Sequence, residues 1–579
     1  MPSRHPFGGR GERVPTRLAA YLRDMTQLAH GPSVLSRGVQ FSVWAPAQEK
    51  VAVRVAGADR SLGRVDGGWW SVVVPEAKLG DRYQLVLADG RALPDPASRR
   101  QPDGVHGPSQ VWDPRRYAWQ HAFPGLPLEE LAFYEVHVGT FTPEGTLDAA
   151  AARLEDVVEL GATCVELLPV QPFPGRRNWG YDGVSLHAVH EGYGGPDALQ
   201  RFVDRAHAVG LAVCLDVVYN HLGPEGNYLG VWGPYFTHRH KSPWGDGVDY
   251  DGPESGPVRG YVLQAALQWV RDFRADVLRL DAVHAIPDGS PRHVVGALCD
   301  AVRTFADESG RRIHVVAESD LQDRKVVDPP ARGWGCAAMW ADDFHHALHA
   351  LLTGERHAFY EDFGGMAPLA RALREGFAFQ GEPSRFRNKP WGTDTRGLTP
   401  ARFVFSLQNH DHVGNRPGGE RLASLVPQEA LFPLAALLLL GPALPLLFMG
   451  EEYGEESPFL YFTSHGDAAL AKAVSEGRRA EHVADAAPGG VPDPQDEATF
   501  RRCVLSHRRD GRHGALWRHH RELLRVRHRH AGEMGRRWPE VSVDRTSVRM
   551  RRPGLEVAVN LGPEPAGGMP GWGWEVREG

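Results

Sequence analysis

Eight apolar stretches, each ending in a loop and most followed by a helical pattern, constrain the fold of this chain more than any other feature. Each stretch is apolar at nearly every position, which predicts strands buried on both faces, as in a parallel sheet. Eight strands alternating with helices are typical of a (β/α)8 barrel, a TIM barrel of the α/β class. The expected strands are 133–138, 164–170, 213–218, 277–280, 313–317, 336–340, 403–407 and 446–449, and the clearest helices are 147–160, 197–209, 262–273, 293–305 and 429–440.

Short strands of alternating polarity are expected on both sides of the barrel. Before it, residues 39–44, 51–55, 70–74 and 83–87 alternate between turn signals, which predicts a small β-sandwich. After it, the tail from Trp538 returns to the same pattern. We therefore divide the chain into a loosely ordered segment (1–30), a β-sandwich domain (31–115), the barrel with long loops after its third and eighth strands (116–535) and a short C-terminal β-domain (536–579).

The charge distribution excludes nucleic acid as the expected partner. Lys and Arg number 65 against 72 Asp and Glu, a formal net charge of −7, whereas phosphate binding needs a clustered cationic surface. The one basic concentration, 501–530, also carries Leu516, Leu523, Leu524 and Val526. These apolar residues favour a solvated helix with one buried face.

No targeting or membrane segment is expected either. The first residues lack the apolar core of a secretory signal. The run 431–450 is apolar, but Pro433, Pro442 and Pro445 interrupt it, which favours a buried helix followed by a buried strand over a membrane span. Five cysteines without a CxxC pair favour reduced thiols in the cytoplasm over a disulfide framework or a zinc site.

Acidic residues follow four of the expected strands, at the edge where a barrel carries its catalytic groups. Asp216 ends the third strand, Asp281 the fourth, Glu318 the fifth and Asp411 follows the seventh. A single acidic residue at a strand end is more often a helix cap or an ion-pair partner. Four that converge are costly, because neighbouring buried carboxylates raise each other's pKa values, so the pattern indicates a functional site.

Two of these carboxylates suit the cleavage of a glycosidic bond, in which one attacks the anomeric carbon and the other protonates the leaving oxygen. Arg279 stands two residues before Asp281, so on a strand both side chains face the barrel interior and the cation favours an ionised aspartate. Glu318 follows an apolar stretch, and such surroundings favour the protonated acid.

Other side chains at the same edge suit a sugar. His221, His410 and Asp411 are placed to bind hydroxyl groups. The flat faces of tryptophans suit sugar rings, although any single tryptophan is as often a packing residue. Sixteen tryptophans are present, and those in expected rim loops include Trp179, Trp232, Trp244 and Trp391.

The segments around these four strand ends resemble the four signature regions of the α-amylase clan of glycoside hydrolases, in the same order and on the expected strands. The resemblance implies a retaining hydrolase with Asp281 as nucleophile, Glu318 as general acid/base and Asp411 as the third carboxylate, which orients the sugar ring. It implies that Arg279 supports the nucleophile. The residues that it implies for binding the sugar at the cleavage site are Tyr181, His221 and His410.

Within the clan, the chain resembles one subgroup most, the maltooligosyl-trehalose trehalohydrolases, on the stretches 180–184, 219–228, 280–286, 408–416, 448–455 and 459–463. This resemblance implies cleavage of the α-1,4-glucosidic bond next to the terminal trehalose of maltooligosyl-trehalose, which releases trehalose and a maltooligosaccharide. It also implies a carbohydrate-binding-like sandwich domain and functional coupling to a maltooligosyl-trehalose synthase. Two positions depart from the subgroup, where Gln is expected in place of His412 and often Asn in place of Ser319.

Recognition of the trehalose unit is expected from loops beyond the cleavage point, because both of its glucose units must be bound. The third loop (225–244), His284 and the eighth-strand loop (451–462) supply acidic and aromatic side chains. We name His284, Glu452 and Tyr461 as substrate-binding residues. Each sugar-hydroxyl partner left unpaired costs about 1–3 kcal/mol, which predicts at least about tenfold preference for the bond next to trehalose.

Other functions stay open at this stage. A glycogen branching or debranching enzyme shares the carboxylates, but branching enzymes typically carry a second acidic residue where Ser319 stands. A general α-glucan hydrolase would cut maltooligosyl-trehalose and plain maltooligosaccharides equally well. A non-catalytic carbohydrate-binding relative is disfavoured, because all three carboxylates are present.

The chemistry requires no cofactor, since protein carboxylates carry both steps. We assign no metal ligand. Asp216 and Asn220 could bind calcium or magnesium, but a hydrogen-bonded strand end explains these residues equally well.

Overall fold

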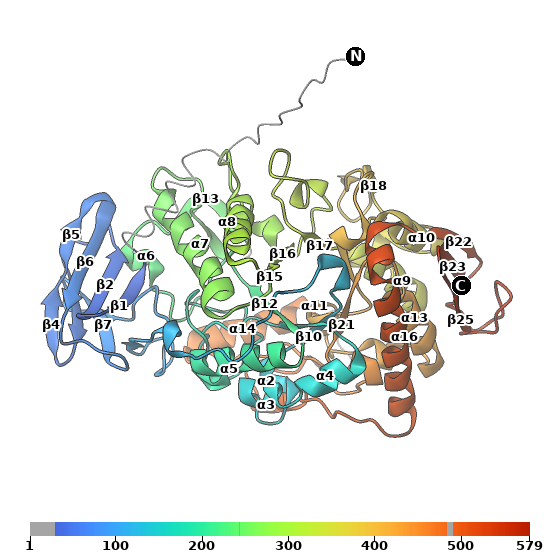
Figure 1. Cartoon of the computed structure of the whole chain (residues 1–579), viewed down its shortest axis with the longest axis horizontal. Helices are drawn as coiled ribbons and strands as arrows, with labels where there is room; N and C mark the ends of the chain where they lie inside the picture. Colours follow the sequence, from blue (N-terminus) through green and yellow to red (C-terminus); the bar gives the residue numbers. More distant parts are fainter. Residues whose placement is uncertain (1–28, 243, 483–489) are drawn as a thin grey trace, which may run out of the picture.

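The computed structural model describes residues 29–242, 244–482 and 490–579. A barrel occupies the middle of the molecule, a β-sandwich lies at one end and a small sheet lies at the other (Figure 1). The segment 1–30, expected to be loosely ordered, lies outside the described residues except for its last two positions.

Eight parallel strands close the barrel in chain order, which confirms the expected fold class. Nearly every strand residue is buried, since the strands pack on side chains inside the barrel and on helices outside it. The strands are β10 (Phe133–Val136), β11 (Cys164–Leu167), β12 (Ala212–Val217), β15 (Val277–Leu280), β16 (His314–Ala317), β17 (Ala338–Trp340), β20 (Phe403–Ser406) and β21 (Leu444–Phe448).

The outer helices follow the expected pattern with two differences. The expected helix 147–160 is two helices, α3 and α4, and the segment after β17 contributes helices that we did not anticipate, α9 and α10. The larger helices around the barrel are α3 (Leu147–Ala151), α4 (Leu154–Leu160), α5 (Gly195–Ala208), α7 (Ser255–Asp272), α8 (Val294–Ser309), α9 (Asp343–Thr353), α10 (Met366–Glu375), α13 (Leu431–Leu439) and α16 (Gly511–Arg536). Short helices are α2 (Val138–Phe141), α6 (Leu229–Trp232), α11 (His410–Gly414), α12 (Leu422–Leu425) and α15 (Glu497–Arg501).

The apolar run 431–450 and the basic stretch 501–530 take the expected forms. The run becomes the buried helix α13 followed by the buried strand β21. In the basic stretch, α16 buries Leu516, Leu523 and Leu524. It also buries Arg527, whose guanidinium donates to the carbonyl oxygens of Leu439 and Ala443. This arginine therefore satisfies backbone acceptors just beyond the end of α13, as the last carbonyls of a helix require.

Two antiparallel sheets form the N-terminal sandwich, and the buried side chains between them include Val39, Phe41, Val53 and Leu85. The first sheet contains β1 (Gly31–Leu35), β2 (Gly38–Trp44), β6 (Trp69–Val74) and β5 (Gly63–Val65). The second contains β4 (Ala58–Ser61), β3 (Val51–Val55), β7 (Arg82–Leu87), β8 (Ala92–Leu93) and β9 (Ser109–Gln110).

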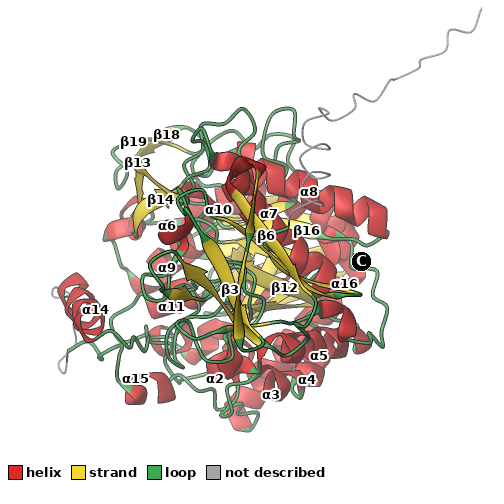
Figure 2. Cartoon of the chain, turned by 90° about the vertical axis from the view of Figure 1, so that its left-hand side faces the viewer, coloured by secondary structure: helices red, strands yellow, loops and turns green. Residues whose placement is uncertain are grey.

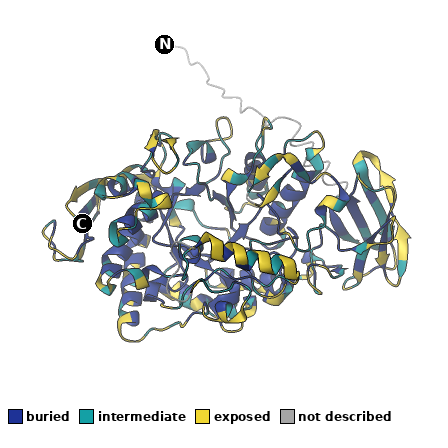
Figure 3. Cartoon of the chain, turned by 180° about the vertical axis from the view of Figure 1, so that it is seen from behind, coloured by how far each residue is buried: buried dark blue, intermediate teal, exposed yellow. Residues whose placement is uncertain are grey.

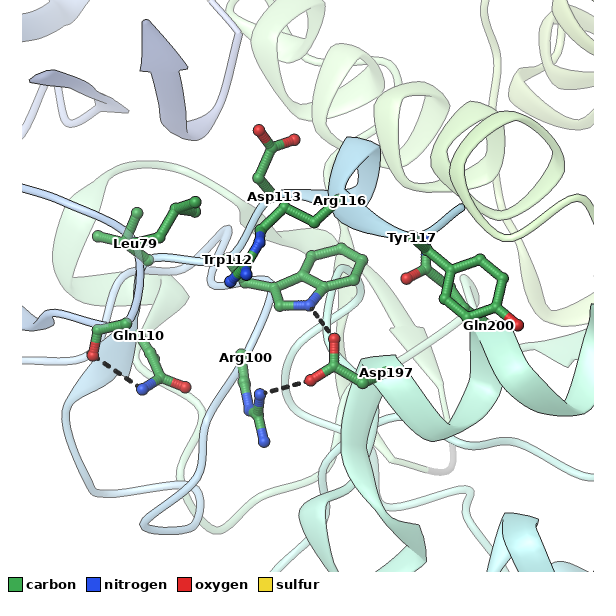
Figure 4. A pocket seen from close by; sticks show the side chains of 11 residues that line it. Leu79, Arg100, Gln110, Trp112, Asp113, Arg116, Tyr117, Asp197 and Gln200 are labelled. Atoms are coloured by element: carbon green, nitrogen blue, oxygen red, sulfur yellow. Dashed lines mark hydrogen bonds and ion pairs between the residues drawn. The ribbon is translucent and has the colours of Figure 1, made fainter. Parts of the chain in front are cut away.

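The segment that leaves the sandwich is attached to the barrel by polar contacts around a cavity of about 390 Å³ (Figure 4). The indole nitrogen of Trp112 donates to Asp197 on α5 at 2.7 Å, and Arg100 donates to the same carboxylate at 2.8 Å. The Trp112 ring stacks on Phe273 with centroids 5.6 Å apart. Because these groups satisfy one another, the cavity marks a domain junction, and none of its lining residues belongs to the acidic cluster at the strand ends.

The C-terminal sheet is antiparallel, in the order β22 (Glu540–Asp544), β23 (Ser547–Arg552), β24 (Leu555–Asn560) and β25 (Trp574–Glu578). It packs on the barrel through contacts of β24 with α13 and of β22 with α10. The sheet therefore covers the outer helices near the end of the barrel sequence (Figure 1).

Three insertions stand out from the barrel. After β12 comes the hairpin of β13 (Phe236–Ser242) and β14 (Gly245–Val248), and between α10 and β20 comes the hairpin of β18 (Glu382–Ser384) and β19 (Lys389–Trp391). Both hairpins lie on the same side of the molecule (Figure 2). The third insertion, after β21, carries α14 (Ala468–Glu481), whose outer face is exposed along its length (Figure 3).

Two further expectations can be compared with the described residues. Among them, no helix is both long and apolar enough to cross a membrane. All five cysteines are buried and unbridged, and the sulfurs of Cys299 and Cys336 lie 3.5 Å apart.

Candidate active site

One buried arginine joins the acidic strand ends at the carboxyl edge of the barrel. Arg279, on β15, is fully buried. Its Nη1 donates to Asp216 at 2.7 Å and to Asp281 at 2.8 Å, and its Nη2 donates to Glu318 at 3.0 Å. The register of the sheet causes this, because Arg279 lies directly beside Asp216 of β12 and Val316 of β16. Three carboxylates therefore share a single cation.

Asp281 has a donor for each of its carboxylate oxygens. Arg279 donates to Oδ1 and the Asn220 side chain donates to Oδ2 at 2.7 Å. Asn220 also donates to the Asp281 backbone oxygen at 3.0 Å, which fixes the strand end. The two donors therefore fix the orientation of this carboxyl group.

Glu318 lies in a different environment. Burial raises its pKa to about 8, and the nearby carboxylates of Asp281 and Asp411 act in the same direction while Arg279 opposes them. The backbone N–H of Ala282 donates to its Oε2 at 2.7 Å. Ala282 is left-handed, with φ 39°, a conformation that is unfavourable for a residue with a side chain. The strained turn thus aims an N–H at the carboxyl group.

Asp411 lies beside a histidine that is held in its charged form. His410 is buried, and its Nδ1 contacts Glu135 at 2.6 Å while its Nε2 contacts the Tyr181 hydroxyl at 2.8 Å. Because that hydroxyl donates to Asp216, both ring nitrogens face acceptors. Burial alone would lower the pKa of His410, but the carboxylates of Asp411 and Glu135 raise it to about 10.

Tyr181 and His221 complete the lining of this cluster. The Tyr181 ring stacks on His410 with centroids 5.3 Å apart, and its hydroxyl donates to Asp216 at 2.6 Å. His221 contacts the Tyr181 carbonyl oxygen at 3.0 Å. The exposed ring of Trp244, between β13 and β14, stacks on His221 at 4.2 Å. These rings form a wall beside the carboxylates.

The structure brings together seven of the ten site residues expected from the sequence, namely Tyr181, His221, Arg279, Asp281, Glu318, His410 and Asp411. His284 lies at the edge of this group, and its Nδ1 accepts from the backbone N–H of Asp320 at 3.2 Å.

The structure does not bring the other two into direct contact with the seven. Glu452 is buried and accepts from the Tyr134 hydroxyl at 3.0 Å. Tyr461 packs against Trp179 and Arg478. A role for either in binding substrate stays a prediction.

Sequence reasoning missed four residues of the site. Glu135 ends the first strand and Trp340 the sixth, and the Arg279 guanidinium lies 4.4 Å from the Trp340 ring. Their positions at strand ends were the available signal. Arg387 and Phe386 lie in the β18–β19 hairpin; Trp391 of this hairpin was expected in a rim loop, but no pattern singled out these two residues.

Arg387 brings that hairpin to the fifth strand end. Its guanidinium is paired with Asp320, two residues beyond Glu318, and lies 4.0 Å from the Trp391 ring. Phe386 is 38% exposed and packs on Phe359, which is 47% exposed. An arginine is therefore bound to Asp320, two residues beyond Glu318, and it lies 5.5 Å from the exposed Phe386 ring.

The structure gives no positive support for a metal at this site. Asn220 and Asp216 are occupied by Asp281, Arg279 and Tyr181. Over the part of the chain that is described, no group of three or more His, Cys, Asp or Glu side chains is arranged to hold a metal ion.

Replacing Glu135 with Gln tests the charge on His410. We expect the pKa of His410 to fall from about 10 by more than about one unit, because a buried opposite charge in contact favours the charged form. Titration of the His410 ring by NMR measures this shift.

Glu166 supplies the matched control on the neighbouring strand. Glu166 lies beside Glu135 in the sheet, but the ring nitrogens of His410 contact Glu135 and Tyr181 and not Glu166. Glu166→Gln should therefore change the His410 titration little. An unchanged His410 titration in Glu135→Gln would contradict the assignment.

Comparison with known proteins places this site in a family. Residues 99–232 match the model of the alpha-amylase catalytic domain. The chain is 44% identical to the malto-oligosyltrehalose trehalohydrolase of Rhizobium sp. (strain M-11), over 93% of this chain and 94% of that protein, and 44% identical to the one from Saccharolobus solfataricus, over 81% and 82%. A crystal structure of a putative alpha amylase from Salmonella typhimurium superposes with a TM-score of 0.86 at 42% identity, covering 92% of this chain and 93% of that one. The chain therefore belongs to the malto-oligosyltrehalose trehalohydrolase family, whose members share the alpha-amylase catalytic domain.

Proposed function

We propose that this protein hydrolyses the α-1,4-glucosidic bond next to the terminal trehalose of maltooligosyl-trehalose, with retention of the anomeric configuration. Family membership supports the substrate class. The observation that carries the chemistry is the Arg279 cluster, in which one carboxyl group, Asp281, is held by two cationic or amide donors and the other, Glu318, has its pKa raised to about 8. Two carboxyl groups with opposite protonation preferences are what glycoside hydrolysis needs.

In the first step, Asp281 attacks the anomeric carbon as Glu318 gives its proton to the leaving oxygen. This forms a covalent glycosyl-aspartate and releases trehalose. In the second step, the Glu318 carboxylate takes a proton from water, whose oxygen attacks the same carbon and displaces Asp281. Glu318 ends protonated and Asp281 ionised, so the enzyme is restored without a cofactor.

The residues around the two carboxyl groups bind the sugar that becomes attached. His410 carries a positive charge and stacks on the Tyr181 ring, and the Asp411 carboxylate lies 3.5 Å from His410 Nε2. A charged donor and a carboxylate acceptor side by side suit two adjacent sugar hydroxyls. Tyr181 and Trp244 offer ring faces to the sugar.

The leaving trehalose lies on the Glu318 side, because the acid must reach the leaving oxygen. Asp320, two residues beyond Glu318, contacts both His284 and Arg387, and Phe386 next to Arg387 packs on Phe359. We assign recognition of the two glucose units of trehalose to these residues. Glu452 and Tyr461 make no direct contact with Asp320, His284 or Arg387. We therefore assign the specificity for trehalose to the β18–β19 hairpin.

The substrate must be supplied by an enzyme that converts the reducing end of an α-1,4-glucan into a trehalose unit. Functional coupling to a maltooligosyl-trehalose synthase follows from this requirement and remains a proposal. The alternative function is that of a general α-glucan hydrolase. A measured preference for the trehalose-linked bond distinguishes the proposed function from this alternative.

Asp281→Asn should lower kcat by at least about a thousandfold while sugar binding is largely kept, since the shape survives and the nucleophile does not. Asp394→Asn, at an exposed ion pair with Arg396, is the matched control and should retain activity.

NMR of the first product of the wild-type protein should show the α-anomer. A β-anomer would remove Asp281 from the nucleophile role.

The pH dependence of kcat/KM tests Glu318. The acid must be protonated, so kcat/KM should fall as pH rises through about 8. Glu318→Gln should reduce turnover of natural glucans far more than that of aryl glucosides with an activated leaving group, which needs little protonation. Equal losses on both substrates would contradict the acid assignment.

Arg387→Gln tests recognition of the leaving group. We expect the preference for the trehalose-linked bond over an internal maltooligosaccharide bond, measured as a ratio of kcat/KM values, to shrink by about tenfold, the effect of one lost polar pairing near 1.4 kcal/mol. Arg396→Gln, at an exposed pair with Asp394 that lies outside the β18–β19 hairpin, should leave the ratio unchanged. If wild-type protein cuts both bonds equally well, a general α-glucan hydrolase is the better description.

A further inference from the structure

Two imidazole rings stack face to face directly beside Asp411. The rings of His412 and His345 are parallel within 3°, and their centroids are 3.5 Å apart. His345 is 4% exposed and the His412 side chain is 10% exposed. His412 belongs to α11 and His345 to α9. The stack therefore joins the helix that carries Asp411 to the helix that follows β17, the sixth strand of the barrel. Neither ring has a part in the chemistry described above.

The hydrogen bonds of His345 are satisfied in its neutral form. Its Nδ1 donates to the Leu407 carbonyl oxygen at 2.6 Å, and its Nε2 lies 3.1 Å from the Tyr360 hydroxyl, which can donate to it. Burial lowers the pKa values of His345 and His412 well below the usual 6.5, so both stacked rings are neutral near pH 7.

The stack fixes both ends of the turn that leads to Asp411. Leu407 ends the strand and His345 holds its carbonyl, while the backbone N–H of His412 donates to the Asn409 side chain at 2.9 Å. On the other flank, His410 is held by Glu135. Asp411 itself has only long contacts, with Asn415 at 3.3 Å and with His410 at 3.5 Å. Its position therefore depends on the anchoring of its two neighbours.

Most neighbours of the stack oppose added positive charge, because His346 and His349 lower the pKa of His412 and Glu355 is already shared by His349 and Arg416. Asp342 acts in the opposite direction, since its Oδ1 lies 3.6 Å from His412 Nε2. The titratable and charged groups that face the stack are His346, His349 and Asp342 from α9 and its start, Glu355 and Tyr360 after α9, His410, Asp411 and Arg416 from α11 and the residues that follow it, and Arg387 and Asp320 from the edge of the site.

We propose that His412 is a positioning residue: stacked in neutral form on His345, it holds α11 so that Asp411 stays in its working place, and protonation of the stacked pair releases Asp411. The inference rests on the proposed function only for the role of Asp411. The stack itself is a property of this chain, in which His412 replaces the glutamine that we expected here.

The sign of the pH effect follows from the direction of the shifts. Burial, and next the neighbouring histidines, hold the pKa values of His412 and His345 well below the usual 6.5. In an opened state these rings bind protons near pH 6.5, so the closed state binds fewer protons below that pH. Stability of the closed arrangement is therefore full above about pH 6.5 and is lost as the pH falls.

Two substitutions separate positioning from general packing. His412→Ala should lower kcat at pH 7 at least tenfold with little change in KM, because the sugar contacts remain and the placement of Asp411 does not. His412→Gln, which keeps a flat polar group that does not titrate, should recover part of that loss. Its acid limb of kcat should also lie at least 0.5 pH unit lower than that of the wild type. The acid limb is measured on whichever α-glucan the wild-type protein hydrolyses best.

His30 provides the matched control, since it is also buried, its pKa is lowered to about 3, and it contacts Trp69 of the sandwich domain and Tyr261 of α7. His30→Gln should not move the acid limb of kcat. Equal movement in both Gln variants would mean that general stability sets the limb and would overturn the proposal.

NMR titration of the histidine rings in the wild-type protein gives a readout independent of activity. The proposal expects His412 and His345 to stay neutral down to the pH at which kcat falls. A His412 ring that titrates near 6.5 without loss of kcat would overturn it. Failure of the trehalose preference alone would refute the proposed substrate and leave this inference standing.

Discussion

The pairing of one buried arginine with three carboxylates is the interaction on which the rest of the site depends. Arg279 is fully buried and bonds to Asp216, Asp281 and Glu318. Removing one partner from a buried pair of this kind typically costs about 3–5 kcal/mol, because the remaining charge is left uncompensated. Since three acids share one cation, they cannot all be ionised at low cost. Burial raises the pKa of Glu318 to about 8, so this group is the protonated acid that the reaction requires.

The barrel could be predicted from the sequence because its signal is local. A strand buried on both faces is a continuous apolar run, and all eight runs are strands in the structure. The helices after β17 could not be predicted with the same ease. In α9, the buried residues include Asp343, His345 and His349, and polar residues on a buried face erase the apolar periodicity on which helix recognition depends.

The same reasoning explains which site residues could be predicted from the sequence. Arg279, Asp281, Glu318 and Asp411 lie at strand ends, where position along the chain fixes position in space. Arg387 reaches Asp320 only because a hairpin inserted between α10 and β20 folds over the edge of the barrel. No pattern within a loop encodes where its tip will lie. Glu452 shows the converse, since a carboxylate next to a strand end turned into the interior toward Tyr134.

The two histidines that flank Asp411 are held in opposite charge states, and the difference comes from their partners. His410 faces the Glu135 carboxylate and a hydroxyl that already donates elsewhere, so both of its nitrogens must donate. His412 faces another buried imidazole, whose own bonds are satisfied in the neutral form and whose pKa is lowered by burial. A single residue type thus provides a fixed cation on one side of a carboxylate and a neutral, stackable ring on the other. Lysine could replace only the first and glutamine only the second, so the exchange of either histidine changes a different property of the same carboxylate.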